Sequence, residues 1–314
     1  QSIAYRAMDT ARVEDKSVKG AVVVMSMQGE ILVLVSYPTY DPNDVPKFLS
    51  DTTENYFLNR AITGQYPPGS VFKMVTAYAG LVSDKIESDT EIEDTGEIKI
   101  GEYRYGTWNF DQAGRKEGNL SLTRALSRSN DIYFYRVGEL VGVTDLVKMA
   151  RKFGLGSTTG IEIGGEAEGL VPDPLWKERR TGESWFLGNT YHLSIGQGDL
   201  LTTPLQVARM SVASVTGRVC RSKIVAESEA ECIDLDIPTP DIEAVKEGMR
   251  AACATGGTAY PFFSFEPYVL CKTGTAQHAG QIPSASSGPK GDDVLPHAWI
   301  TVAYPGENPE LVIT

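Results

Sequence analysis

Two residues that together could carry out nucleophilic chemistry, Ser70 and Lys73, open a segment that is otherwise almost entirely apolar. The apolar residues between 71 and 82 predict a helix that is buried on most of its circumference. A buried ammonium group is costly unless it is paired or loses its proton, so a lone lysine there indicates a chemical role. Residues three apart share a helix face, which brings the Lys73 amine within reach of the Ser70 hydroxyl. This is the arrangement of a nucleophile and its base.

The same two residues also have a plain structural interpretation. Ser70 could be the N-cap of the helix, and the Lys73 side chain could extend along the apolar surface to water. Because Ser-x-x-Lys is a short pattern, the pattern alone favours this structural interpretation, and the chemical one depends on what else the chain contains.

A second candidate motif, Lys272-Thr273-Gly274-Thr275, lies in a predicted strand. Glycine weakens a strand interior and usually marks a bulge or the close approach of another backbone. With hydroxyls and an amine beside it, the strand edge could hold a peptide whose terminal carboxylate is bound by Lys272, Thr273 and Thr275. An exposed strand with polar residues on one face explains the pattern equally well.

A third motif, Ser129-Asn130-Asp131, stands between helical patterns at 121–126 and 132–140. Serine, asparagine and aspartate are common N-caps, and in isolation the motif is best interpreted as the start of the second helix.

The elements that must position these motifs follow from the hydrophobic pattern. Residues 20–37 predict a β-hairpin, GAVVVMS then ILVLVSY, with cover on both faces. The middle of the chain is mainly helical, but residues 154–198 are rich in glycine and proline, so we expect them to be irregular. Strands return at 268–276, 298–304 and 311–314. Strands at both ends of the chain predict a single antiparallel sheet.

Two further helices and one loop have clear boundaries. Thr203, Pro204 and Gln206 occupy the N-cap, N1 and N3 positions of a predicted helix. A second helix at about 241–253 is ended by Gly256-Gly257. The serine-, glycine- and proline-rich residues 279–293 predict a mobile loop.

The composition narrows the class of protein. The chain has 314 residues, 41% of them hydrophobic, and a net charge of -12 without long runs of Lys or Arg. A globular domain with a sizeable core is therefore expected, and a nucleic-acid partner is not. No apolar run is long enough to span a bilayer. Because the chain starts at Gln1 and stops within a predicted strand, we expect it to be a piece of a longer protein.

Cysteine and histidine are too few and too scattered for a metal site. The four cysteines form no Cys-x-x-Cys pair, and there are three histidines. We expect no metal and no cofactor. Cys220 and Cys232 could form a disulfide across a short hairpin, but four buried thiols are the favoured interpretation. Cys271, next to Lys272, is expected to be a packed thiol.

The order of the three motifs resembles that of the serine penicillin-recognising enzymes. Longer segments, NRAITGQYPPGSVFK at 59–73, SIGQGDLLTTPLQ at 194–206 and KTGTAQ at 272–277, are similar to the transpeptidase domain of class B penicillin-binding proteins. The resemblance covers residues from about 20 to 314. The YPPGS form and the segment GEAEGLVP at 165–172 resemble the elongation type, penicillin-binding protein 2.

The resemblance implies an α+β fold with a central antiparallel five-stranded sheet, helices on both faces and an all-helical subdomain. The sheet subdomain would comprise about 15–50 and 205–314, and the helical subdomain about 60–200. An N-terminal membrane anchor and a dimerisation or pedestal region would lie outside this chain. The domain would then face the extracytoplasmic side of the bacterial inner membrane.

The resemblance also implies a mechanism. Ser70 would attack the penultimate D-Ala carbonyl of a peptidoglycan stem peptide, and Lys73 would take its proton, with its pKa lowered by burial and by Lys272. Ser129 would relay a proton to the leaving amine, and Asp131 would orient the network. The backbone N–H groups of Ser70 and Thr275 would form the oxyanion hole. The strand residues Thr273, Gly274 and Thr275 would bind substrate.

The implied partners are stem peptides as donor and acceptor, β-lactams that acylate Ser70, a SEDS-type glycosyltransferase and the cell-wall elongation complex. Asp131 replaces the asparagine of much of the wider group, as in elongation-type members. Some of these carry zinc between the first two motifs, but residues 74–128 contain no Cys or His.

Two alternatives remain. A D,D-carboxypeptidase or β-lactamase would share the serine and lysines but hydrolyse the Ser70 ester. No Glu-x-x-Leu-Asn segment of the kind that serves class A β-lactamases occurs between Asp131 and Lys272. A β-lactam sensor or scaffold would bind partners without catalysing transpeptidation.

Overall fold

The computed structural model describes residues 1–15, 18–51, 53–225, 229–277 and 296–314. The predicted loop at 279–293 lies outside the described residues.

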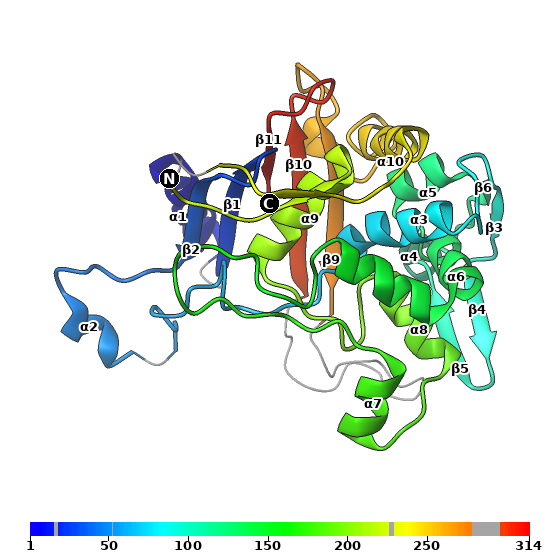
Figure 1. Ribbon diagram of the computed structural model, residues 1–314, viewed down its shortest axis with the longest axis horizontal. Coiled ribbons are helices and arrows are strands. Elements are labelled where there is room, and N and C mark those ends of the chain that lie inside the picture. Colours follow the sequence, from blue (N-terminus) through cyan, green and yellow to red (C-terminus); the bar gives the residue numbers. More distant parts are fainter. Residues whose placement is uncertain (16–17, 52, 226–228, 278–295) are drawn as a thin grey trace.

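A five-stranded antiparallel sheet forms the centre of the molecule, in the order β2-β1-β11-β10-β9 (Figure 1). The strands are β1 (Gly20–Ser26), β2 (Ile31–Tyr37), β9 (Leu270–Ala276), β10 (His297–Tyr304) and β11 (Leu311–Ile313). Strand β1 pairs with β11, with Val24 opposite Ile313, so the two ends of the chain meet inside the sheet. The prediction of one antiparallel sheet built from both termini is confirmed. The cover on both faces of the hairpin is incomplete, because Leu32 on the edge strand is 48% exposed.

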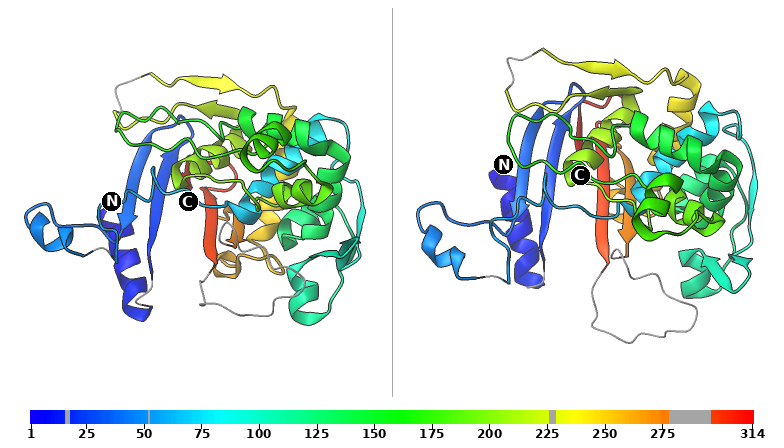
Figure 2. Two further views of the ribbon diagram at one scale, coloured as in Figure 1. Left: turned by 90° about the horizontal axis from the view of Figure 1, so that it is seen from below. Right: turned by 60° about the horizontal axis from the view of Figure 1, so that its bottom comes forward.

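Helix α9 (Pro204–Thr216) packs across β1, β11 and β10 and is buried along almost its whole length. The predicted start of this helix is confirmed. The Thr203 hydroxyl accepts from the Gln206 N–H at 3.1 Å, and the Gln206 carboxamide accepts from the Thr203 N–H at 2.9 Å. This capping box gives each of two buried backbone N–H groups a side-chain oxygen as its hydrogen-bond partner. On the outer side of the hairpin, α1 (Ser2–Glu14) lies along β2 (Figure 2).

The helical part of the molecule lies beside β9 and surrounds α3 (Lys73–Val82). Its main helices are α5 (Leu122–Arg128), α6 (Asp131–Lys152), α8 (Leu187–Ser194) and α10 (Thr239–Ala252). Helix α3 packs against α6 and α10, and every residue from Lys73 to Leu81 is buried. The predicted buried helix is confirmed, with a 3₁₀ turn, η1 (Gly69–Phe72), in front of it.

The expectation that residues 154–198 are irregular is wrong for two helices, α7 (Pro174–Thr181) and α8. Helix α7 buries only Lys177, so it has no apolar stripe that a pattern search could detect. It is fixed at its start by the Asp173 carboxylate, which accepts from the Trp176 N–H at 2.8 Å. Two-stranded ribbons lie outside the central sheet: β3 (Ile92–Asp94) with β6 (Gly118–Leu120), β4 (Glu97–Ile100) with β5 (Tyr103–Gly106), and β7 (Arg218–Cys220) with β8 (Cys232–Asp234).

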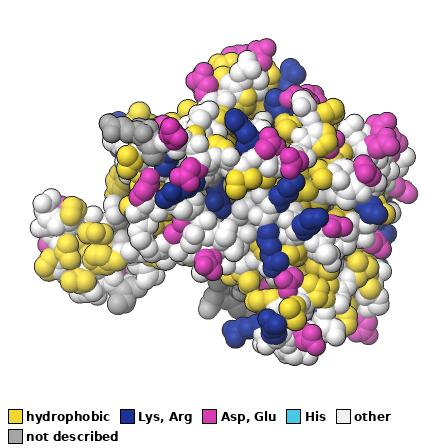
Figure 3. Space-filling model, viewed as in Figure 1, with side chains coloured by type: hydrophobic (Ala, Val, Ile, Leu, Met, Phe, Trp, Pro, Cys, Tyr) yellow, Lys and Arg dark blue, Asp and Glu magenta, His cyan; other side chains and the backbone are white. Residues whose placement is uncertain are grey.

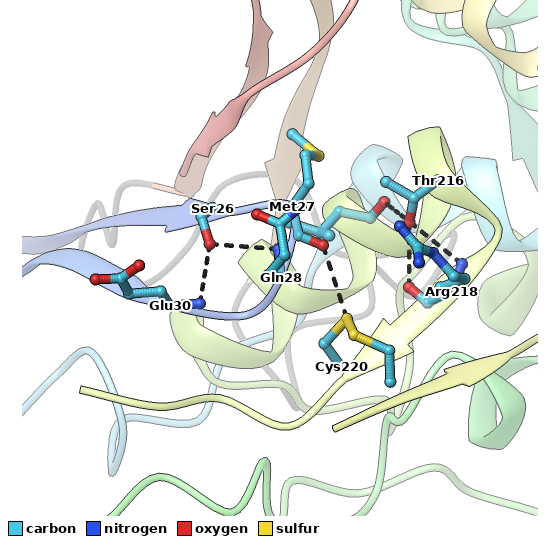
Figure 4. Close-up of a disulfide and its surroundings, with 9 residues drawn as sticks. Ser26, Met27, Gln28, Glu30, Thr216, Arg218 and Cys220 are labelled. Carbon is cyan, nitrogen blue, oxygen red and sulfur yellow. Dashed lines mark hydrogen bonds between the residues drawn. A yellow bond between two sulfur atoms is a disulfide. The ribbon is translucent and has the colours of Figure 1, made fainter. Parts of the chain in front are cut away.

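The expectation of four free thiols is also wrong, because the cysteines form two disulfides. Cys220 and Cys232 are register partners in β7 and β8, which places them side by side (Figure 4). Cys253, the C-cap of α10, is joined to Cys271 on β9 because α10 packs against that strand. The packing of a helix on a strand leaves no trace in cysteine spacing, so the second pair was not predicted.

The surface carries mixed charge. On the face shown in Figure 3, basic and acidic side chains are interspersed, and apolar side chains gather on the projection that carries α2 (Val45–Leu49). Leu49, the last residue of α2, is 65% exposed. Across the described residues, no helix is both long and apolar enough to cross a membrane.

Candidate active site

Ser70 lies in the 3₁₀ turn η1, directly before α3, and is only partly buried. The turn is held from two sides. The Trp299 indole N–H from β10 donates to the Pro67 carbonyl at 2.9 Å, and the Gly69 N–H donates to the Gly196 carbonyl at 2.8 Å. Gly69 has φ +55, a conformation that favours glycine. The turn therefore presents a partly exposed hydroxyl at the N-terminal end of a buried helix, where the helix dipole favours negative charge.

The Lys73 amine is fully buried and bonded to the second motif. It donates to the Asp131 carboxylate at 2.6 Å and to the Ser129 carbonyl at 2.7 Å, and it lies 3.3 Å from the Ser129 hydroxyl. Among the described residues, no hydrogen bond joins this amine to the Ser70 hydroxyl. Lys73 is therefore not a side chain that extends to water, and its buried charge has a carboxylate partner.

Ser129 reaches both lysines because of an unusual backbone conformation. It ends α5 at φ 53, in the left-handed region. Such a conformation costs a serine about 1 kcal/mol or more and persists only where the surroundings fix it. Asn130 then caps α6 by accepting from the Tyr133 N–H at 3.0 Å. The N-cap interpretation of this motif is therefore right for Asn130, while Ser129 and Asp131 on either side face Lys73.

Lys272 approaches the same hydroxyl from the sheet. Its amine donates to the Ser129 hydroxyl at 2.8 Å and to the Thr273 carbonyl at 3.0 Å, and its side chain is fully buried. The Ser129 hydroxyl thus lies between two amines that come from a helix and a strand.

Burial sets the electrostatics of this cluster. Removal from water lowers the pKa of Lys73, and the Asp131 carboxylate opposes that shift. The pKa of Lys272 is lowered well below its usual value, first by burial and then by the positive charge of Lys73. The expected fall in the Lys73 pKa through burial is confirmed, and the repulsion between the two amines disfavours both being charged at once. Lys73 is hydrogen-bonded to the Asp131 carboxylate, whose negative charge also acts on Lys272.

Gly274 on β9 faces η1, the turn at Gly69–Phe72 that carries Ser70 and that we call the nucleophile turn. A Cβ at this position would lie 3.1 Å from the Pro68 carbonyl oxygen and 3.2 Å from Val71 Cγ1. The predicted close approach of another backbone is confirmed, and the neighbour is the chain's own turn. Next to it, the Thr273 and Thr258 hydroxyls are 2.7 Å apart, and Thr275 is exposed.

One contributor to the site was not predicted. The segment around Gly196 and Gln197 touches both the nucleophile turn and β9, where the Gln197 carboxamide donates to the Thr275 carbonyl at 3.2 Å. The only signal in the sequence was its place in the segment 194–206 that resembles the family. Within the part of the chain that the structure describes, no group of three His, Cys, Asp or Glu residues could hold a metal ion.

The family model of the penicillin binding protein transpeptidase domain matches residues 20–314. The chain belongs to this family. It is 33% identical to the peptidoglycan D,D-transpeptidase MrdA of Haemophilus influenzae, over 94% of this chain and 49% of that protein. The chain therefore spans about half the length of the curated relatives it matches.

Solved structures of the family agree with the fold. The penicillin-binding protein PBP2 of Helicobacter pylori superposes with a TM-score of 0.85 at 32% identity, covering 97% of this chain and 57% of that one. The same protein in complex with MreC gives 0.84 at 32% identity, with the same coverage. The resemblance to penicillin-binding protein 2 and the α+β fold that it implies are both confirmed.

Proposed function

We propose that this chain is the catalytic domain of a peptidoglycan D,D-transpeptidase, which cross-links stem peptides through an acyl-enzyme on Ser70. The observation that carries the proposal is the Ser129 hydroxyl, which is held between the Lys73 and Lys272 amines beside the nucleophile turn. A scaffold would have no need to bury two amines around one hydroxyl, because each burial costs free energy.

In the acylation step, the Ser70 oxygen attacks the penultimate D-Ala carbonyl as its proton passes to a neutral lysine amine, for which we propose Lys73. The charge on the carbonyl oxygen is stabilised by the backbone N–H groups of Ser70 and Thr275. The C–N bond then breaks, and the Ser129 hydroxyl passes its proton to the leaving D-Ala amine while it takes up the proton that Lys73 received from Ser70. Asp131 orients the lysine, and β9 binds the donor peptide through Thr273, Gly274 and Thr275.

In the second step, the amine of another stem peptide attacks the Ser70 ester. A C–N bond forms, the C–O bond to Ser70 breaks, and the proton lost by the amine returns to the Ser70 oxygen. β-Lactams form the same ester by opening of the lactam ring, and we expect water to cleave it slowly.

Labelling of the chain with a fluorescent penicillin tests the proposal. We expect one covalent adduct, located on Ser70 by peptide mass spectrometry, that is lost in Ser70→Ala and kept in Ser50→Ala, a change at the exposed serine at the C-cap of α2. Absence of any adduct on the wild-type chain would favour a scaffold. Turnover of the adduct within seconds would favour a β-lactamase.

A donor assay separates transpeptidase from carboxypeptidase. With a peptide ending in D-Ala-D-Ala and an added amine acceptor, we expect release of D-Ala together with a product that contains the acceptor. Release of D-Ala with only the hydrolysed peptide would overturn transpeptidation while leaving the acyl-enzyme intact.

We further propose that the intact protein is anchored in the inner membrane by an N-terminal helix and acts in the cell-wall elongation machinery with a SEDS-type glycosyltransferase. The support is the likeness to PBP2 of Helicobacter pylori, which has been solved in complex with MreC. Co-purification of the full-length protein with membrane-bound partners tests this, and a fully soluble full-length protein would contradict it.

A further inference from the structure

Residues 196–202, which we call the support segment, run beside the stretch that leads into Ser70. The backbones of Tyr66 and Thr202 exchange two hydrogen bonds, each of 2.9 Å. At the other end of the segment, Gly196 accepts from the Gly69 N–H at 2.8 Å. The support segment is therefore bonded at one end to the residues before the nucleophile turn and at the other end to the turn itself.

The fit between the two stretches leaves no spare room. Gly196 has φ +76, and a Cβ added to it would lie 2.1 Å from the Gly69 carbonyl oxygen and 2.8 Å from Phe72 Cβ. Only glycine permits this approach. The position of the Gly69–Ser70 peptide unit thus depends directly on Gly196.

The next residue of the support segment, Gln197, bonds to the opposite wall of the site. Its carboxamide donates to the Thr275 carbonyl at 3.2 Å. Among the strands that the structure describes, β9 pairs with β10 alone, and its other edge carries no strand. A Cβ added to Gly69 would lie 2.8 Å from the Thr275 carbonyl oxygen. The edge of β9 that carries this carbonyl therefore faces the nucleophile turn.

The Thr275 N–H lies on the same edge of β9 as the Thr275 carbonyl, the edge that faces the nucleophile turn. In an antiparallel strand, the N–H and C=O of one residue point to the same side. A bond to the Thr275 carbonyl therefore restrains the strand edge that also carries the Thr275 N–H. Two adjacent residues, Gly196 and Gln197, thereby contact the carbonyl groups next to the two N–H donors assigned to the oxyanion hole, those of Gly69 and Thr275.

We propose that Gln197 is a positioning residue for the oxyanion hole. It sets the spacing between the Ser70 and Thr275 N–H groups, which belong to elements that no covalent link or shared strand pairing holds together. Donors aimed in advance at the developing charge stabilise the transition state more than the bound substrate. Loss of Gln197 should then slow acylation rather than weaken binding. This inference rests on the proposed acyl transfer at Ser70.

The test measures acylation of the full chain by a fluorescent penicillin and separates the binding constant from the acylation rate constant. Gln197→Met keeps the size of the side chain and removes the donor, and Gln197→Glu replaces the donor with a charged acceptor. We expect each to lower the acylation rate constant about tenfold, less than the hundredfold or more typical of losing an oxyanion donor itself. The binding constant should change less than about twofold.

A second readout reports on the tetrahedral state directly. A boronic acid that forms a tetrahedral adduct with the active-site serine should lose affinity in proportion to the fall in the acylation rate constant. Gln28→Met, the same change at an exposed glutamine in the β1–β2 turn, is the matched control and should alter neither quantity. Thermal unfolding of the Gln197 variants should stay close to that of the wild type, because the hydrogen bond lies at the surface.

An unchanged acylation rate constant in both Gln197 variants overturns the inference, and so does a loss confined to the binding constant. Faster acylation also overturns it, since Gln197 would then be blocking the Thr275 carbonyl against substrate. The wild-type chain distinguishes the two levels of the argument. If the wild type is not acylated, the proposed function fails, whereas an acylated wild type with unaffected Gln197 variants contradicts only the role of Gln197.

Discussion

At the scale of single residues, Asp131 affects how readily each of the two lysines loses its proton. It is the carboxylate bonded to Lys73, at 2.6 Å, and its negative charge acts on Lys272 as well. Burial lowers the pKa of both amines, while Asp131 raises it. With one carboxylate for two buried amines, the cluster favours one ammonium and one neutral amine. A neutral amine is what proton abstraction from Ser70 requires.

Asp131→Asn should move the rising limb of the acylation pH profile to lower pH. The carboxylate holds a proton on Lys73 through its charge and its hydrogen bond, and asparagine removes the charge. The lysine pKa then falls further below its usual value of 10.5, so the neutral base forms at lower pH. The rising limb also moves to lower pH if Lys272 is the base, because Asp131 raises the pKa of Lys272 as well. Acylation rates measured from about pH 5 to 10 report this shift.

The control is Asp145→Asn, which removes a carboxylate from an exposed position of the same helix. Its profile should match that of the wild type. A limb that stays in place in Asp131→Asn, or moves to higher pH, would show that Asp131 does not set the lysine pKa.

At the scale of elements, the site depends on how closely β9 approaches the turn η1. Gly274 allows that approach, and the Trp299 indole from β10 ties the start of the turn to the sheet. The 3₁₀ turn and the strand are thereby fixed to each other before any substrate arrives. This closeness is a packing property of two elements, and a single methyl group is enough to test it.

Gly274→Ala should destabilise the protein by about 1–3 kcal/mol and slow acylation of Ser70. The added Cβ would contact the Pro68 carbonyl oxygen at 3.1 Å and Trp299 Cβ at 3.1 Å, so β9 must move away from the turn. Denaturant unfolding and the acylation rate measure the two effects. Gly164→Ala is the control, since a Cβ there meets nothing within 4 Å and the residue is exposed. Equal stability and acylation in the two variants would refute the packing argument.

At the scale of the whole molecule, the sheet joins both ends of the chain, and the β7–β8 ribbon is joined to it near the β1–β2 turn. Cys220 Sγ lies 3.7 Å from the Met27 carbonyl oxygen (Figure 4). The Ile31 N–H donates to the Lys223 carbonyl at 2.8 Å. None of the proposed catalytic residues belongs to this ribbon. A change in the β7–β8 ribbon should therefore alter the free energy of unfolding without altering the acylation rate.

Removal of the Cys220–Cys232 disulfide should lower stability without slowing acylation. A cross-link between residues 12 apart restricts the unfolded chain, and its loss should cost about 3 kcal/mol. The double variant Cys220→Ala/Cys232→Ala should thus unfold at lower denaturant concentration than the wild type, with an unchanged acylation rate. Unchanged stability would mean that the disulfide contributes nothing, and slower acylation would mean that the ribbon reaches the site.

The sequence by itself determined what depends on neighbours along the chain. The buried helix after Ser70, the capping box at Thr203 and the strands at both ends follow from local pattern, and the three motifs follow from short segments. The tertiary structure decided which side chains meet. Ser129 lies 56 residues from Lys73 and 143 from Lys272, and no spacing rule predicts that its hydroxyl lies between their amines.

The same holds for the Cys271 disulfide, for the turn that Gly274 faces and for the contact of Gln197 with Thr275. Local pattern encodes the conformation of each element because backbone and neighbouring side chains act over a few residues. Contacts between elements are fixed only when the core is packed. The hydrophobic effect is non-directional, and it depends on how all the elements pack together rather than on neighbours in the sequence.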